Sequence, residues 1–330
     1  MSLVLTGVPV LVVDGPEADV TAELLRDQGA VPVAWGDIAT RIGLVRIPAG
    51  TEAQAAEDAL AWAHRNGIPV DDRRGRTSPV SAVGASADTS TGSVTLVGGG
   101  PGDADLVTVA GVRAIEAADV ILADHLGAIT LADEAAERGA EVIDVAKIPY
   151  SRQVSQERIN EIILEKARAG LNVVRLKGGD PFIFGRGHEE VTACAEAGIP
   201  VTVIPGVTSV TSAPAAAGVS LTHRGVNHDV TVVSGHLPPG HEKSLVNWDA
   251  LAQMTGTLVL IMAVRNAGAI ATELIAKGQD AATPVVVIEN ASTDKQRVTG
   301  ASLETLGETI EREGLGSPAI IVIGEAAARR

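Results

Sequence analysis

Short aliphatic runs recur along the chain and alternate with alanine-rich stretches of helical spacing and with glycine turns. A continuous aliphatic run is typical of a strand that is buried on both faces, and such strands alternate with helices in parallel α/β sheets. The pattern therefore predicts an α/β architecture throughout. The predicted strands are Val8–Val13, Val94–Val97, Val120–Ala123, Val142–Val145, Val173–Leu176, Val201–Ile204, Val230–Val233, Leu258–Met262, Val285–Ile288 and Ile320–Ile323.

The pattern stops between Asp71 and Gly92, where charged residues, serine, threonine and glycine replace bulky apolar ones. This composition is typical of a linker. A second boundary is expected at Pro205–Gly206, a turn that precedes a helix rich in proline and alanine. The prediction is two lobes with a cleft between them, preceded by a small segment. The predicted parts are a segment over 1–71, a linker over 72–92, one lobe over 93–205 and a second lobe over 206–330.

The charge balance limits the partners of this chain. Its 26 basic and 41 acidic residues give a formal net charge of −15, which argues against nucleic acid and against anionic membranes. No stretch approaches the roughly 18 apolar residues of a spanning helix, and the first residues lack the pattern of a secretory signal, so we expect a cytoplasmic location. The single cysteine, Cys194, predicts neither a disulfide nor a zinc site. Any anionic ligand therefore requires a local cluster of basic side chains.

The first segment begins like a dinucleotide-binding fold, with a strand, a turn, a helix and a strand. The fingerprint Gly-x-Gly-x-x-Gly needs its glycines so that the backbone can approach a pyrophosphate. Here the turn Asp14–Asp19 contains one glycine and three carboxylates. We therefore expect no NAD and predict a degenerate Rossmann-like segment that is structural, while a role in binding some small ligand stays open.

Two glycine-rich loops follow predicted strands of the main body. The first, Gly98–Thr108, lacks both the third glycine of a dinucleotide fingerprint and the lysine of a P-loop, so a neutral or cationic ligand fits it better than a phosphate. The second, Lys177–Gly187, reads KGGDPFIFGRG and is far more specific. Glycines at the carboxyl end of a parallel strand let backbone groups reach a ligand. The second loop is therefore predicted to contact a ligand, while the first loop, taken alone, is either a ligand site or a tight turn.

Charged residues at other strand ends and loops extend this prediction. Asp124 and Lys147 each follow an aliphatic strand, where a charge is either solvated or functional, and both fall on the edge that carries the glycine loops. Basic and donor groups also occur in loops of the second half, and together they would bind a polyanionic substrate. These candidates are His223, Arg224, His236 and Arg297.

Residues 93–330 resemble the uroporphyrinogen-III C-methyltransferases of the tetrapyrrole methylase family. The resemblance rests on VTLVGGGPGDADLVT, KGGDPFIFGRG, IPGVTS, LTHRG, SGHL, TLVLIM and VIENASTDKQRV. It implies two α/β lobes, a homodimer, and S-adenosylmethionine as cofactor with S-adenosylhomocysteine as its product, without a metal. It also implies methylation of uroporphyrinogen III at C2 and C7 to give precorrin-2, which feeds sirohaem or cobalamin synthesis. The first segment stands where some relatives carry a dehydrogenase–ferrochelatase module, and it looks truncated.

The resemblance also implies roles for individual residues. Asp124 matches a proposed proton acceptor and Lys147 a proposed proton donor. Ala123, His125 and His188 depart from the usual pattern, and the first two affect the expected substrate contacts. The residues that match cofactor positions are Pro101, Gly178, Gly179, Asp180, Ile183, Thr208, Ser209, Met262 and Ala291.

Two alternatives remain at this point. A methylase of the same fold would act on a later corrin intermediate, or on a protein or RNA, although the acidity of the chain argues against RNA. A non-catalytic ligand-binding protein would carry Asp124 and Lys147 as surface charges. Tight cofactor binding without turnover of any tetrapyrrole would favour this second alternative over an enzyme.

Overall fold

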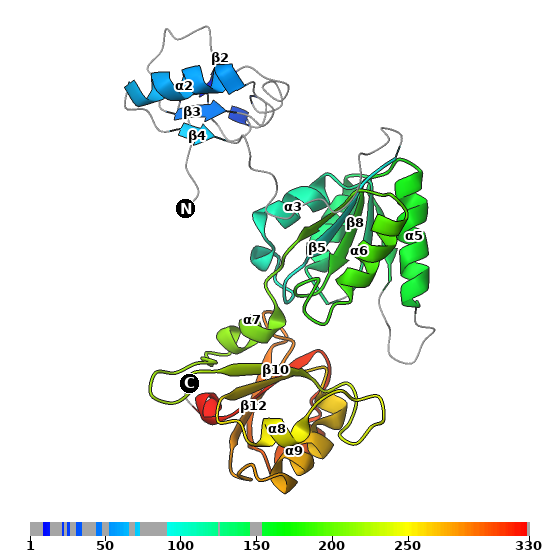
Figure 1. Ribbon diagram of the computed structural model, residues 1–330, viewed down its shortest axis with the longest axis vertical. Helices are drawn as coiled ribbons and strands as arrows, with labels where there is room; N and C mark the ends of the chain where they lie inside the picture. The colour runs from blue at the N-terminus through cyan, green and yellow to red at the C-terminus, as the bar shows by residue number, and fades with distance from the viewer. Residues whose placement is uncertain are drawn as a thin grey trace. The chain divides into compact units, whose positions relative to one another are not determined.

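The chain divides into two compact units, Met1–Pro79 and Val80–Arg330, in the computed structural model (Figure 1). The structure describes the following residues: 9–13, 22, 25–26, 31–34, 44–47, 53–65, 70–72, 91–124, 126–145 and 154–328. Within these ranges, no helix combines the length and the apolar character that crossing a membrane requires.

The first unit contains a four-stranded parallel sheet with the order β2-β1-β3-β4. Helix α2 (Ala53–Arg65) packs on it through small buried residues such as Ala56 and Ala59, which meet Val45 of the sheet. The turn Asp14–Asp19 lies outside the described residues, so its interpretation stays a prediction. The strands are β1 (Pro9–Val12), β2 (Val31–Ala34), β3 (Leu44–Ile47) and β4 (Val70–Asp72).

The first lobe of the second unit is built on a parallel sheet with the order β7-β6-β8-β5-β9. All residues of β6 and β8 are buried, because helices cover both faces of the sheet. This explains why their sequences read as nearly continuous aliphatic runs. The strands are β5 (Val94–Gly98), β6 (Val120–Ala123), β7 (Glu141–Asp144), β8 (Val173–Lys177) and β9 (Val201–Ile204).

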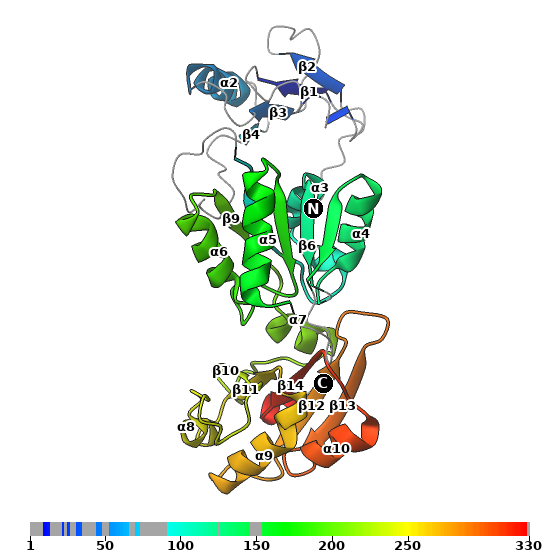
Figure 2. The ribbon, with the colours of Figure 1, turned by 90° about the vertical axis from the view of Figure 1, so that its right-hand side faces the viewer.

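Four helices cover the two faces of this sheet, as Figure 2 shows. Ile159 and Ile163 pack on one face and Ile115 on the other. Thr108 caps the N-terminus of the helix Val109–Glu116: its hydroxyl oxygen accepts a hydrogen bond from the Gly111 N–H, at 3.1 Å. The helices are α5 (Gln156–Arg168) and α6 (Gly187–Glu196) on the first face, and α3 (Val109–Glu116) and α4 (Ile129–Glu137) on the second.

The second lobe has a mixed sheet with the order β10-β11-β14-β12-β13, whereas aliphatic runs of this kind are typical of parallel sheets. Only β10 and β11 run parallel; the other three pairs are antiparallel. The α/β architecture predicted from the sequence holds, but an aliphatic run does not encode strand direction. The strands are β10 (Val230–Ser234), β11 (Thr257–Ile261), β12 (Pro284–Glu289), β13 (Arg297–Ser302) and β14 (Ala319–Ile323).

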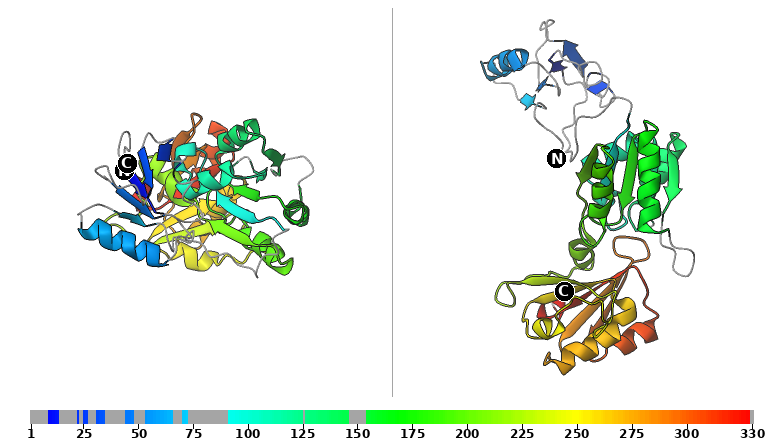
Figure 3. Two further views of the ribbon diagram at one scale, coloured as in Figure 1. Left: turned by 90° about the horizontal axis from the view of Figure 1, so that it is seen from above. Right: turned by 45° about the vertical axis from the view of Figure 1, so that its right-hand side comes forward.

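Helices again cover both faces of this sheet (Figure 3). The predicted helix after Pro205–Gly206 is α7 (Ser209–Ala216), whose buried residues Val210 and Ala213 pack on the sheet of the second lobe. Each of the ten predicted strands overlaps an observed one with ends displaced by at most one residue. The prediction missed β3 and β4 of the first unit, and it missed β13, which has no aliphatic run. The helices that cover the other face of this sheet, opposite α7, are α8 (Trp248–Ala252), α9 (Ala267–Ala276) and α10 (Leu306–Glu313).

Candidate functional site

Hydrogen bonds join the two predicted glycine loops at one edge of the sheet of the first lobe. Strands β5 and β8 are parallel neighbours, so their carboxyl ends lie together. The Gly99 N–H donates to the Lys177 carbonyl at 2.7 Å. The Gly179 N–H donates to the Gly100 carbonyl at 2.7 Å, and the reverse hydrogen bond measures 3.3 Å. This edge is where open parallel sheets bind ligands.

Several of these glycines are required by close packing between loops. A Cβ atom on Gly178 would lie 2.8 Å from the backbone carbon of Leu126, and one on Gly206 would lie 2.6 Å from Gly98 Cα. The glycine run therefore serves chain packing as well as the ligand contact predicted from sequence. Gly179 differs, because it has a φ of 66° and its Cβ direction faces Ser209, another predicted cofactor position.

Asp124 lies directly after β6 and organises the loop after β8. Its Oδ1 accepts hydrogen bonds from the N–H groups of Gly178, at 3.0 Å, and Leu126, at 3.2 Å. Its Oδ2 lies 3.4 Å from Arg175 Nη2. The Asp124 side chain remains 19% exposed. The carboxylate is thus fixed by three donors yet accessible from outside.

A buried charge cluster, formed by Arg175, Lys177 and Glu190, lies behind Asp124. Arg175 Nε and Lys177 Nζ each lie 3.1 Å from Glu190 Oε1, and Glu190 is fully buried on α6. Burial lowers the pKa of Lys177, the neighbouring Arg175 charge lowers it further, and Glu190 and Asp124 oppose this change. The sequence analysis missed this cluster, although an arginine inside the aliphatic run VVRLK requires a buried partner.

Asp180 ties its loop to the turn that precedes the second lobe. Its Oδ1 accepts a hydrogen bond from the Phe182 N–H at 2.8 Å, and its Oδ2 accepts one from the Gly206 N–H at 3.1 Å.

The loop that carries Pro101 lies close to a loop of the second lobe. A Cβ atom on Gly102 would lie 3.0 Å from Thr293 Cγ2. The loops that carry Pro101 and Ala291, one from each lobe, are therefore adjacent.

The loops around the predicted cofactor positions hold strained backbone. Met262, Asn290 and Ser292 have φ values of 56°, 49° and 63°. Positive φ is uncommon for residues other than glycine, and such residues cluster at ligand sites.

Gln296, which the sequence analysis missed, fixes the loop that carries Ala291. Its Oε1 accepts the Ser292 N–H at 2.8 Å, and its Nε2 donates to the Ala216 carbonyl of α7 at 3.2 Å. The strained backbone and the Gln296 contacts together fix the conformation of the loop at the predicted cofactor position Ala291.

Three of the predicted substrate residues are exposed on loops next to the sheet of the second lobe: His223, Arg224 and His236. The His223 N–H donates to Asn227 Oδ1 at 2.9 Å, and Asn227 Nδ2 donates to the carbonyls of Leu221 and Asp229. Asn227 therefore sets the shape of the LTHRG turn. His236 Nδ1 lies 2.9 Å from Ser234 Oγ, at the end of β10.

Arg297 is placed differently from the other three. Its Nε pairs with Glu289 Oε2 at 2.5 Å, and its two terminal nitrogens donate to the carbonyls of Glu313 and Gly314, each at 3.1 Å. Glu289 also accepts the Gly316 N–H at 2.6 Å. Arg297 thus joins β12 and β13 to the end of α10, and its predicted contact with substrate stays a prediction.

Replacing Arg297 with methionine should lower stability at pH 7, and the difference from the parent should disappear on acidification. Burial alone raises the pKa of Glu289, but its bonds to Arg297 and to the Gly316 N–H outweigh burial and lower it. A lowered carboxyl pKa stabilises the fold above the unfolded value of about 4.3. This stabilisation is lost as pH falls through the folded value. Urea unfolding at several pH values measures the difference; a difference independent of pH would contradict the prediction.

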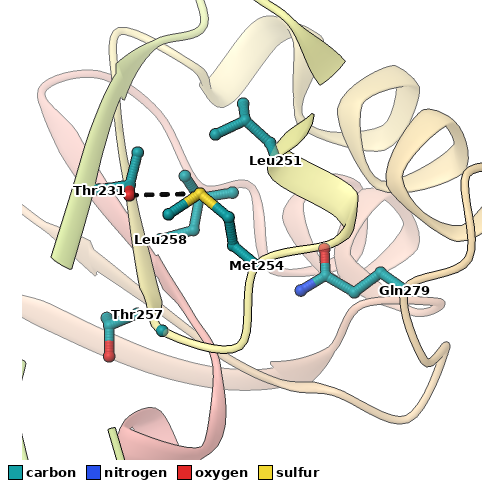
Figure 4. Close-up of a pocket in the computed structure, with 7 residues that line it drawn as sticks. Thr231, Leu251, Met254, Thr257, Leu258 and Gln279 are labelled. Carbon is teal, nitrogen blue, oxygen red and sulfur yellow. Dashed lines mark hydrogen bonds between the residues drawn. The ribbon is translucent and has the colours of Figure 1, made fainter. Parts of the chain in front are cut away.

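Two hollows in the second unit differ greatly in size. One, shown in Figure 4, has a volume of about 10 Å³ and is partly closed by Met254, whose sulfur accepts a hydrogen bond from the Thr231 hydroxyl at 3.5 Å. It holds a single water at most. The other has a volume of about 340 Å³, and Phe184 of the first lobe lines it together with Val232 and Ser234 of β10.

The remaining predicted residues have different outcomes. Lys147 and His125 lie outside the described residues. His188 is exposed and makes an edge-on contact with Phe182, with ring centroids 6.4 Å apart. Burial, with a smaller contribution from Glu190, raises the pKa of Cys194 to about 12, so this thiol is unreactive. Among the described residues, no three histidine, cysteine or acidic side chains are grouped as metal ligands.

Comparison with known proteins identifies the family. Residues 93–307 match the tetrapyrrole (corrin/porphyrin) methylases. The chain belongs to this family. It is 43% identical over 233 residues to uroporphyrinogen-III C-methyltransferase of Bacillus subtilis, covering 71% of this chain and 90% of that protein. It is 44% identical over 235 residues to siroheme synthase 1 of Klebsiella pneumoniae, covering 71% of this chain but only 49% of that protein.

Solved structures agree with this assignment. Uroporphyrin-III C-methyl transferase from Thermus thermophilus, complexed with S-adenyl homocysteine, matches with a TM-score of 0.61 and 38% identity. The match covers 72% of this chain and 94% of that one. The family and the two-lobed α/β fold expected from the motifs are thereby confirmed. The chain spans about half the length of the siroheme synthase relative.

Proposed function

We propose that this tetrapyrrole methylase transfers methyl groups from S-adenosylmethionine to C2 and C7 of uroporphyrinogen III, giving precorrin-2. One observation carries the proposal: the two glycine loops are joined at the strand ends, with the Asp124 carboxylate fixed beside them. The similarity to a uroporphyrinogen-III C-methyltransferase over 90% of its length supports the choice of substrate.

The cofactor would be held by loops of both lobes. When bound, S-adenosylmethionine supplies an electrophilic methyl group and leaves as S-adenosylhomocysteine. The protein's task is to align this methyl group with a nucleophilic ring carbon. The strained backbone at Met262 and around Ala291 supports their part in binding. The proposed contacts are Pro101, Gly178, Gly179, Asp180, Ile183, Thr208, Ser209, Met262 and Ala291.

Asp124 is the proposed proton acceptor. When a ring carbon forms its bond to the methyl group, a proton must leave the substrate, and the partly exposed Asp124 carboxylate accepts it. Lys147 is the proposed proton donor. The exposed side chains His223, Arg224 and His236 would bind the acetate and propionate arms, whereas Arg297 would do so only while keeping its contacts with Glu289.

A direct assay tests this proposal. Protein mixed with S-adenosylmethionine and anaerobic uroporphyrinogen III should yield a product that has gained two methyl groups, as measured by mass spectrometry and absorbance. A corrin intermediate accepted in preference to uroporphyrinogen III would favour the first alternative. Cofactor binding without methylation of any tetrapyrrole would favour a ligand-binding protein.

Four further parts of the proposal concern the assembly, the location, the use of the product and the first unit. We propose a homodimer in the cytoplasm, in line with the family resemblance, and a product that feeds sirohaem or cobalamin synthesis. We also propose that the first unit has no dehydrogenase or chelatase activity, because the sequence of Asp14–Asp19 has carboxylates where a dinucleotide fingerprint has glycines.

Removing the first unit should therefore leave methyl transfer nearly unchanged. A chain that begins at Val80 retains the whole second unit. Its kcat and KM are expected to match those of the full chain, and the full chain supplied with NAD and iron should stop at precorrin-2. NAD-dependent formation of sirohydrochlorin by the full chain would contradict this expectation.

A further inference from the structure

We propose that Glu190 is a positioning residue for methyl transfer, acting through Arg175 to hold the Asp124 carboxylate in its reacting orientation. The inference rests on the proposed function, in which Asp124 accepts the proton. Glu190 lies in the first turn of α6, directly after the Lys177–Gly187 loop, and is fully buried. Its carboxylate contacts Arg175, and Arg175 in turn contacts Asp124.

Arg175 makes the connection between the two carboxylates. Its Nε lies 3.1 Å from Glu190 Oε1, and its Nη2 lies 3.4 Å from Asp124 Oδ2. Between these ends, Nη1 donates to the Leu122 carbonyl at 3.2 Å and to the Leu176 carbonyl at 2.6 Å. The planar guanidinium is thus fixed between the ends of β6 and β8, and Glu190 determines which way its fork points.

Glu190 is itself held from several sides. Its Oε1 accepts hydrogen bonds from Gln156 Nε2, at 3.2 Å, and from Lys177 Nζ, at 3.1 Å, in addition to Arg175. Gln156 also donates to Asn160 Oδ1 at 3.1 Å on α5. Two helices therefore anchor the carboxylate that orients Arg175.

The energetics argue for a role beyond stability. Desolvation of a buried ion pair is costly, and apolar side chains of similar volume often stabilise a protein equally well. Arg175 nevertheless interrupts an aliphatic strand, and its side chain is only 5% exposed. Among the described residues, the contact with Asp124 is the one that connects Arg175 to a partly exposed charged group. Side chains that support a reacting group in this way set its geometry.

A double-mutant cycle tests the inference. Glu190→Gln keeps the shape of the side chain but removes its charge, and we expect kcat to fall by roughly ten- to a hundredfold with KM little changed. In the Asp124→Asn background, the same change should alter kcat by no more than about twofold, the scatter of independent sites. Glu196→Gln, an exposed carboxylate on the same helix, is the matched control and should leave kcat unchanged.

Binding of S-adenosylhomocysteine, measured by calorimetry, supplies a second readout. Its affinity should stay within roughly twofold in Glu190→Gln, since Gly178 remains bonded to Asp124 Oδ1. Equal losses of kcat in both backgrounds, or a large loss of affinity, would overturn the positioning role. If Glu190→Gln does not fold, Arg175→Lys answers the same question, because it keeps the charge but not the fork. A parent protein that methylates no tetrapyrrole would instead refute the proposed function, and the inference with it.

Discussion

Replacing Asp124 with asparagine will lower kcat by about a hundredfold, the usual effect of losing an acid–base group. The amide cannot accept the proton, but its oxygen can still receive the N–H groups of Gly178 and Leu126. Affinity for S-adenosylhomocysteine should therefore stay close to that of the parent. Single-turnover kinetics and calorimetry measure the two quantities separately.

Asp124→Ala distinguishes the two roles of this carboxylate. Alanine removes the acceptor that holds the Gly178 loop, so both kcat and cofactor affinity should fall. Asp133→Asn, an exposed site on α4, serves as control. Parental turnover in both Asp124 variants would show that Asp124 is a structural charge.

Gly206→Ala will destabilise the second unit by about 1–3 kcal/mol, the usual cost of overpacking. The added methyl group would meet the Gly179 carbonyl and would lie 2.6 Å from Gly98 Cα, and neither backbone atom can move freely. Because these loops carry the proposed cofactor positions, cofactor affinity should fall too. Urea unfolding and calorimetry measure the two effects.

Gly268→Ala is the matched control for this prediction. Gly268 lies within α9, where the new Cβ would meet Gly307 Cα at an ordinary 3.4 Å. Alanine favours helix over glycine, so stability should stay the same or rise slightly. If the Gly206→Ala protein is as stable as the Gly268→Ala protein, the loops that carry Gly98, Gly179 and Gly206 are packed less tightly than the structure indicates.

Much of the fold was readable in the sequence, because burial on both faces leaves a continuous aliphatic run. The ends of the ten predicted strands fall within one residue of the observed ones. Strand β7 is an edge strand without fully buried residues, yet it keeps the aliphatic pair Val142 and Ile143. Strand β13, RVTGAS, is also an edge strand without fully buried residues, and it was missed because it has no such pair. Strand direction in the second lobe was equally invisible, since a buried strand has the same composition in parallel and antiparallel pairs.

The site divides in the same way. The sequence by itself determined which loops meet at the candidate site, since residues that follow neighbouring parallel strands gather at one sheet edge. Only the tertiary structure decided what each residue does there. Gly206 packs against Gly98, Arg297 pairs with Glu289, and Arg175 links Glu190 to Asp124. These pairs join residues from separate elements, and a side chain's partner depends on how the elements pack, which local sequence patterns do not encode.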